Sequence, residues 1–166
     1  MVTLMALPAI AATKACDAKA HGAKADGTTK DTQAIQSAID DCAKAGGGTV
    51  KLAGGIFLSG PIVLKSNITL DIAKGATLFG SPDHAVYPAI TEFRAPGTQS
   101  LVSASNAENV AITGAGTIDG NGESWWAEAR AHRGSGIVGT VQFRPRLVVF
   151  DHCKHVRIEG VTIQNS

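Results

Sequence analysis

One short phrase occurs three times in this sequence and limits the possible folds more than any other feature. Each copy is a polar corner followed by an alternating apolar run, and the copies are 65–70, 107–112 and 153–158. Asn67, Asn109 and His155 hold the same place in the three copies and are 42 and 46 residues apart. Each copy is followed by a glycine (Gly75, Gly116 or Gly160) and a second strand-like pair (77–78, 117–118 or 162–163). A repeated strand, corner and strand is typical of stacked coils.

Short strands fill most of the chain between and around these copies. Apolar residues alternate in pieces of about three to six residues, broken by glycine-rich turns. The 19 glycines and the aromatic content of only 5% suit thin strands joined by tight corners. Segments 81–100 and 120–139 lack the alternation, and we expect them to leave the coil stack as long connections. The second should contain a short helix over 124–131.

One strong helix is predicted before the first repeat, over residues 31–45. Ile35, Ala38, Ile39 and Cys42 recur at helical spacing and form one apolar face. Asp31 is the predicted N-cap, and the glycines at 46–48 end the helix. We expect this helix to cover the open edge at the N-terminal end of the stack.

The pattern favours an all-β fold, a right-handed single-stranded parallel β-helix with a short N-terminal capping helix. A β-sandwich and an antiparallel barrel are the alternatives. In the parallel β-helix, Asn67 and Asn109 would stack as an asparagine ladder whose amides bind one another and the turn backbone. His155 replaces asparagine in the third copy.

The net charge, the N-terminal segment and the cysteines indicate which partners and which cellular compartment to expect. A formal net charge of +1 gives no reason to expect nucleic acid or a membrane as partner. Residues 1–13 are apolar with a small-residue cleavage pattern, which predicts the remnant of a secretory signal and a secreted or periplasmic protein. In that setting Cys16, placed before the first strand, could pair with Cys42 at the end of the helix. Cys153 is expected to be a buried small side chain.

Three residues are candidates for binding a sugar. Trp125 and Trp126 lie in the second connection, where a flat indole face could cover a pyranose ring, although packing of the connection onto the stack explains them as well. Arg144 could hold an acidic sugar by a forked hydrogen bond, or be a plain surface cation.

Acid–base and metal chemistry find little support in the sequence. Asp71, Asp119, Asp151 and Glu159 lie near strands without forming an acidic cluster, so we interpret them as surface or turn residues. The stretch 152–155 contains two histidines and a cysteine, but no further group has zinc-like spacing. We predict no metal and no cofactor.

At this point the sequence resembles a known family. Segments 17–27, 31–39 and 46–50 look like the cap and first coil of pectin-lyase-like β-helices. Segments 59–70, 75–78, 116–126 and 144–166 resemble glycoside hydrolase family 28, the polygalacturonases. The resemblance implies hydrolysis of α-linked galacturonic acid chains with inversion and without a metal. It also implies a pectic polysaccharide as partner and a monomeric full-length protein.

The catalytic motifs of that family are missing from the sequence. It has no Asn-Thr-Asp, Gly-His-Gly or Arg-Ile-Lys, and its Asp40-Asp41 pair falls on the capping helix. No catalytic residue is therefore transferred. We expect residues 14–166 to form the cap and first coils, truncated before the catalytic coils and inactive alone. A non-catalytic glycan-binding β-helix of the tailspike type and a pectate lyase are the other hypotheses. We also expect the coil at 156–163 to expose apolar side chains and to favour aggregation.

Overall fold

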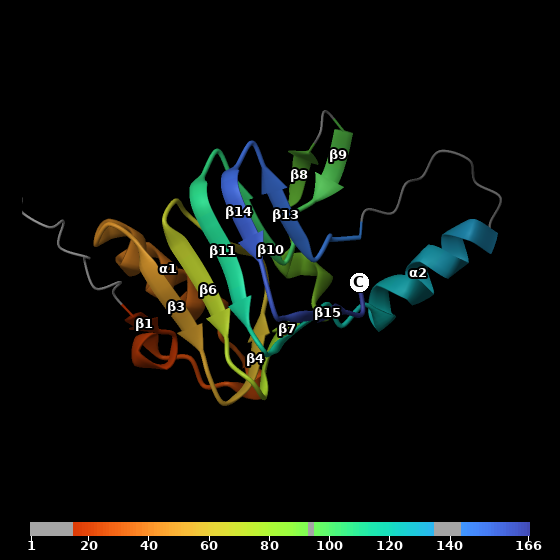
Figure 1. The fold of residues 1–166 in the computed structure, drawn as a ribbon. Helices are drawn as coiled ribbons and strands as arrows, with labels where there is room; N and C mark the ends of the chain where they lie inside the picture. The colour runs from red at the N-terminus through yellow and green to blue at the C-terminus, as the bar shows by residue number, and fades with distance from the viewer. Residues whose placement is uncertain (1–14, 93–94, 135–143) are drawn as a thin grey trace, which may run out of the picture.

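The computed structural model describes residues 15–92, 95–134 and 144–166, which wind into three parallel sheets around one core (Figure 1). The first sheet contains β1 (Ala15–Asp17), β3 (Gly48–Leu52), β6 (Ile68–Ile72), β11 (Glu108–Gly114) and β14 (Lys154–Ile158). The second contains β2 (Asp26–Lys30), β4 (Gly55–Ser59), β7 (Ala76–Gly80), β12 (Thr117–Asp119) and β15 (Thr162–Gln164). The third contains β5 (Ile62–Val63), β10 (Val102–Ser105) and β13 (Val148–Asp151). The predicted right-handed parallel β-helix is confirmed.

The core is built from columns of apolar side chains, one from each coil. Phe57 pairs with Leu78, which pairs with Ile118, and all three are fully buried. Burying each such side chain contributes about 1.5–3 kcal/mol. The alternation visible in the sequence therefore marks the inward face of each strand.

The predicted ladder is present at the corner before the first sheet. Asn67, Asn109 and His155 all adopt the left-handed conformation, with φ of 62°, 56° and 53°. The Asn109 amide donates to Asn67 Oδ1 at 2.9 Å, and His155 Nδ1 lies 3.2 Å from Asn109 Oδ1. Because an amide oxygen only accepts, the ring nitrogen is the donor in that contact. His155 thus continues the ladder.

The glycines that follow the three copies are not equivalent in the structure. Gly160 lies against Gly114, which pairs with Ile72, whereas the sequence matched it to Gly116. The number of residues between the first-sheet strand and the second-sheet strand differs from coil to coil. The glycines that follow the three copies in the sequence therefore do not occupy the same position in each coil. The second strands still pair in register, with Thr162 beside Thr117.

The N-terminal cap contains η1 (Lys19–His21) and α1 (Thr32–Lys44), which packs beside β1 and β3 (Figure 1). The apolar face predicted for α1 is buried, and it consists of Ile35, Ala38, Ile39 and Cys42. The Gln36 amide also binds β5, because Oε1 accepts from the Val63 N–H at 2.8 Å and Nε2 donates to the Val63 carbonyl at 3.1 Å. A side chain thus replaces the missing neighbouring strand at the edge of the third sheet.

Asp31 is the N-cap residue of α1, as predicted, but its side chain has a different partner from the one that a capping residue usually has. Its side chain makes no hydrogen bond to the helix. The two carboxylate oxygens instead accept from the backbone N–H groups of Lys24 and Ala25, at 2.7 and 2.9 Å. Asp31 is only 2% exposed. Through its two hydrogen bonds, the carboxylate connects the segment before β2 to the start of the helix.

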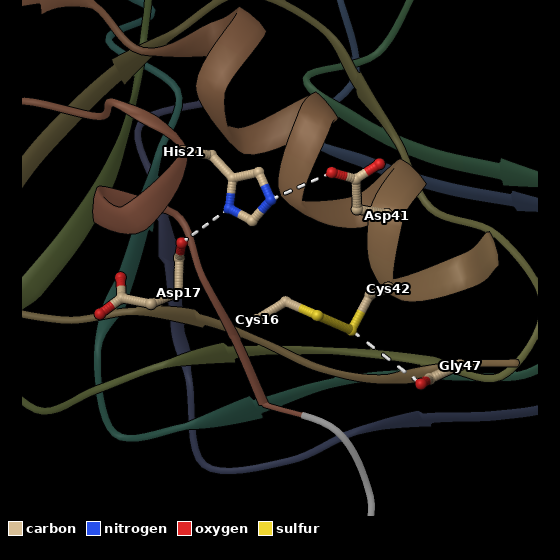
Figure 2. Close-up of a disulfide and its surroundings, with 6 residues drawn as sticks. All are labelled: Cys16, Asp17, His21, Asp41, Cys42 and Gly47. Atoms are coloured by element: carbon tan, nitrogen blue, oxygen red, sulfur yellow. Dashed lines mark hydrogen bonds and ion pairs between the residues drawn. A yellow bond between two sulfur atoms is a disulfide. The ribbon is translucent and has the colours of Figure 1, made fainter. Parts of the chain in front are cut away.

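A disulfide joins the strand and the helix of the cap, as Figure 2 shows. Cys16 lies within β1 rather than before the first strand, and it bonds to Cys42 of α1 with a Cα–Cα distance of 6.1 Å. His21 bridges the same two segments: its Nδ1 lies 3.0 Å from the Asp17 carbonyl oxygen and its Nε2 3.4 Å from Asp41 Oδ2. Lys44, and to a smaller extent His21, lower the pKa of Asp41.

Two long connections complete the chain. The first contains η2 (His84–Val86) and an antiparallel hairpin, β8 (Ala89–Glu92) and β9 (Ala95–Thr98), which the sequence did not predict. The second contains α2 (Glu123–Gly134), slightly longer than the helix expected at 124–131.

The structure describes the last coil but not the first 14 residues. The signal-sequence prediction for residues 1–13 lies outside the described residues. In the last coil, Val156, Ile158 and Ile163 are 40%, 46% and 42% exposed, as expected for that coil. None of the described helices is long and apolar enough to cross a membrane.

Candidate functional site

Both long connections leave the stack at the same corner, between the second and third sheets. The first joins β7 to β10 and the second joins β12 to β13. Because β7 pairs with β12 and β10 pairs with β13, the two connections start and end side by side in consecutive coils. Loops held by a rigid scaffold in this way commonly carry function.

An aromatic cluster joins the two connections. The His84 ring stacks on Trp125, with ring centroids 3.6 Å apart and planes at 15°, and Tyr87 meets Trp125 edge-on at 5.7 Å. Trp125 is 8% exposed, and burial raises the pKa of Tyr87 to about 12. The predicted sugar platform at Trp125 is therefore covered by residues of the first connection.

Trp126, the next residue, lies at a different surface. It lines a shallow cavity of about 160 Å³ together with Phe79, Asp119, Asn121, Gly122, Glu123 and Asn165. Its indole N–H donates to the Ser166 carbonyl at 2.7 Å. Gly122 permits this close packing, since a Cβ there would lie 2.8 Å from both Trp126 Nε1 and the Asn165 carbonyl oxygen. The cavity thus combines an aromatic wall with amide and carboxylate groups.

Asp119, one of two acidic residues that line the cavity, accepts three hydrogen bonds. Its Oδ1 accepts from the Asn121 backbone N–H at 2.8 Å, and its Oδ2 accepts from the side-chain amides of Gln164 and Asn165, both at 2.8 Å. Three N–H donors satisfy a carboxylate that is only 9% exposed. Asp119 therefore orders the corner, which agrees with its interpretation as a turn residue.

The other acidic candidates lie apart from this cavity. Asp71 of the first sheet accepts from Thr113 Oγ1 at 3.0 Å. Asp151 of the third sheet pairs with His152 at 2.8 Å, and Arg157 donates to Glu159 at 2.9 Å. Within the described residues, no three acidic, histidine or cysteine side chains gather in a way that could hold a metal ion.

The structure brings Trp126 and not Arg144 to the cavity. Arg144 is exposed, at the end of the second connection before β13, and is not among the lining residues. Phe79, Asn121 and Asn165 line the cavity and were not predicted. Phe79 had a signal in the sequence, because it is an aromatic residue at an outward position of an alternating strand.

Comparison with known proteins agrees with this architecture. The sequence matches Glycosyl hydrolases family 28 over residues 42–166. Exo-poly-alpha-D-galacturonosidase of Dickeya chrysanthemi is 34% identical, over 88% of this chain and 25% of that protein. Endo-polygalacturonase of Pectobacterium carotovorum subsp. carotovorum is 31% identical, over 86% of this chain and 38% of that protein.

A solved structure supports the same assignment. The family 28 exopolygalacturonase of Yersinia enterocolitica superposes with a TM-score of 0.78 and 26% identity, over 93% of this chain and 35% of that one. The chain spans between 25% and 38% of the length of the two curated relatives named above. The match over residues 42–166 and the shared parallel β-helix place the chain in glycosyl hydrolases family 28.

Proposed function

We propose that this chain is the N-terminal part of a secreted hydrolase that cleaves α-linked galacturonic acid chains of pectin with inversion. The observation that carries the proposal is the family match over residues 42–166, together with relatives named for the degradation of polygalacturonate. Within that enzyme, the chain supplies the cap, the first coils and one wall of the sugar-binding surface.

The cavity beside Trp126 has suitable chemistry for a sugar. A pyranose ring has an apolar face, which an indole covers, and a rim of hydroxyl groups, which amides bind. Asn121 and Asn165 provide such amides, and Glu123 provides a further acceptor. The chemistry therefore fits a single sugar ring resting on Trp126.

Charge determines which part of a uronate this cavity takes. Asp119 and Glu123 repel a carboxylate, so the ring and its hydroxyl groups face the cavity. The carboxylate of that sugar then faces away from the cavity, and we propose that the exposed Arg144, which does not line the cavity, holds the carboxylate of another sugar of the polysaccharide by a forked hydrogen bond.

Hydrolysis itself is not proposed for these residues. Inversion needs two carboxyl groups roughly 6.5–9.5 Å apart across the bond that breaks. Asp119 is held by three N–H donors, while Asp71 and Asp151 lie on other sheets. The chain also lacks the family's catalytic motifs. We expect it to bind substrate weakly and to cleave nothing.

Two measurements on the purified chain test the proposal. Calorimetric titration with trigalacturonate should give saturable binding that Trp126→Ala weakens, and a neutral galactose trisaccharide should bind more weakly. Polygalacturonate incubated with the chain should release no reducing sugar. Equal binding by the Trp126→Ala variant would reject the sugar site, and release of reducing sugar would reject the scaffold role.

A further inference from the structure

We propose that His84 is a positioning residue that fixes Trp126 at the sugar cavity through its stack on Trp125. This inference rests on the proposed sugar site beside Trp126. His84 belongs to the first connection and both tryptophans to the second, so the inference assigns the first connection a part in substrate binding.

Asp83 holds η2 in place. Asp83 accepts from the Ala85 N–H at 3.1 Å, which caps the short helix. Its Oδ2 lies 2.7 Å from Lys30 Nζ of β2, and Lys30 is the largest cause of the lowered pKa of Asp83. His84 therefore extends from a segment anchored to an early coil of the stack.

Ring stacking and one polar contact join the two connections. The His84 ring lies nearly parallel to Trp125 at 3.6 Å, and His84 Nε2 is 3.2 Å from Ser124 Oγ in the same first turn of α2. Tyr87, 6% exposed, closes the edge of the indole. Trp125 Nε1 is buried and has no hydrogen-bond partner in the described part of the chain. The described contacts of the indole are thus ring contacts, which His84 and Tyr87 supply.

The first turn of α2 links this stack to the cavity. Trp125 and Trp126 are consecutive residues of α2, so they point about 100° apart around the helix axis. Fixing the Trp125 ring against His84 sets the rotation of the first helical turn and therefore the direction of Trp126. At its other end the Trp126 ring reaches the last coil, where it donates to Ser166. Without the stack, the indole wall of the cavity would be held by that contact and by its packing against Gly122 at the start of α2.

The experiment uses the fact that the chain has two tryptophans. The Trp125→Phe variant keeps an aromatic ring for His84 and leaves Trp126 as the single tryptophan, which is excited selectively at wavelengths that Tyr87 does not absorb. In this background we expect His84→Ala to increase the fast anisotropy decay of Trp126 and to weaken trigalacturonate binding about three- to tenfold. His84→Phe restores a flat ring and should return both quantities to the values of the background variant.

The outcomes separate this inference from the sugar site on which it rests. If Trp126→Ala leaves binding unchanged, the sugar site is wrong. If Trp126→Ala weakens binding while His84→Ala changes neither the anisotropy nor the affinity, the positioning role alone is wrong. If His84→Phe fails to rescue a folded variant, as judged by unchanged far-UV circular dichroism, ring stacking is not the cause.

Discussion

Asp31 offers a sharp test of how the cap is held together. A helix N-cap aspartate and the aspartate seen here predict different responses to the same substitutions. Serine is as good an N-cap residue as aspartate, and losing a cap costs about 1 kcal/mol. If Asp31 acted as a cap, Asp31→Ser would be nearly neutral and Asp31→Ala would cost about 1 kcal/mol.

The structure predicts much larger losses for both variants. Asp31 is buried and accepts two backbone hydrogen bonds, of 2.7 and 2.9 Å, from Lys24 and Ala25. A hydrogen bond to a charged group contributes about 1.5–3 kcal/mol, so losing both should cost roughly 3–6 kcal/mol. A serine hydroxyl is too short to replace a carboxylate that spans two N–H groups, so Asp31→Ser should lose nearly as much as Asp31→Ala.

Urea unfolding followed by circular dichroism measures the difference. With a slope of about 2 kcal/mol per molar urea, a loss of this size lowers the midpoint by roughly 1.5–3 M. The Thr32–Lys44 helix should remain in the folded variants, since its buried face is unchanged. A midpoint for Asp31→Ser within about 0.5 M of the parent chain would refute this account of the cap.

Three further predictions concern the ladder, the disulfide and two ion pairs. At Asn109, where φ is 56°, Asn109→Ala should cost more than Asn109→Gly, because both variants lose the ladder amide but only alanine strains the left-handed backbone; equal midpoints in urea would contradict this. Reduction of the Cys16–Cys42 disulfide, which closes a span of 26 residues, should cost about 3.5 kcal/mol, and an unchanged midpoint with reductant would contradict that value. The pKa values of Asp40 and Asp83 are lowered from 3.8, by Lys65 and Lys30 respectively, so their stabilisation is complete above pH 3.8 and is lost as pH falls through the lower values of the folded state. Acid titration at low ionic strength should show this loss, and a double variant with asparagine at both positions should show less of it.

The repeat predicted the fold because the physics of a coil stack is visible in sequence. Each inward position must be apolar, and it stacks on the equivalent position of the next coil. Leu70 and Ile112, both buried, are one such pair. Asn109 could be predicted for the same reason, since a ladder needs a hydrogen-bonding side chain at one place in each coil. Gly160 was matched to Gly116 instead of Gly114 because the corners between strands can differ in length. Such a difference changes the spacing of the corner glycines but leaves the alternation in the strands unchanged.

Side-chain partners distant in sequence could not be predicted. Asp31 has the residue type of an N-cap, and nothing in the sequence says that its oxygens face Lys24 and Ala25 instead. Trp125 and Trp126 were equal candidates because adjacent helical residues differ only in direction. The stack that buries Trp125 depends on His84, 41 residues earlier, and only the meeting of two connections at one corner reveals it.

The measurement that most directly tests the central claim is a titration of the isotopically labelled chain with trigalacturonate, monitored through the indole N–H signals of its two tryptophans. The account predicts a saturable shift of the Trp126 signal, whose side chain lines the cavity, and little change at Trp125, which is buried against His84. The Trp126→Ala variant should lose the shifting signal and bind more weakly. An unmoved Trp126 signal at saturating trigalacturonate would contradict the claim that this chain supplies a wall of the sugar site.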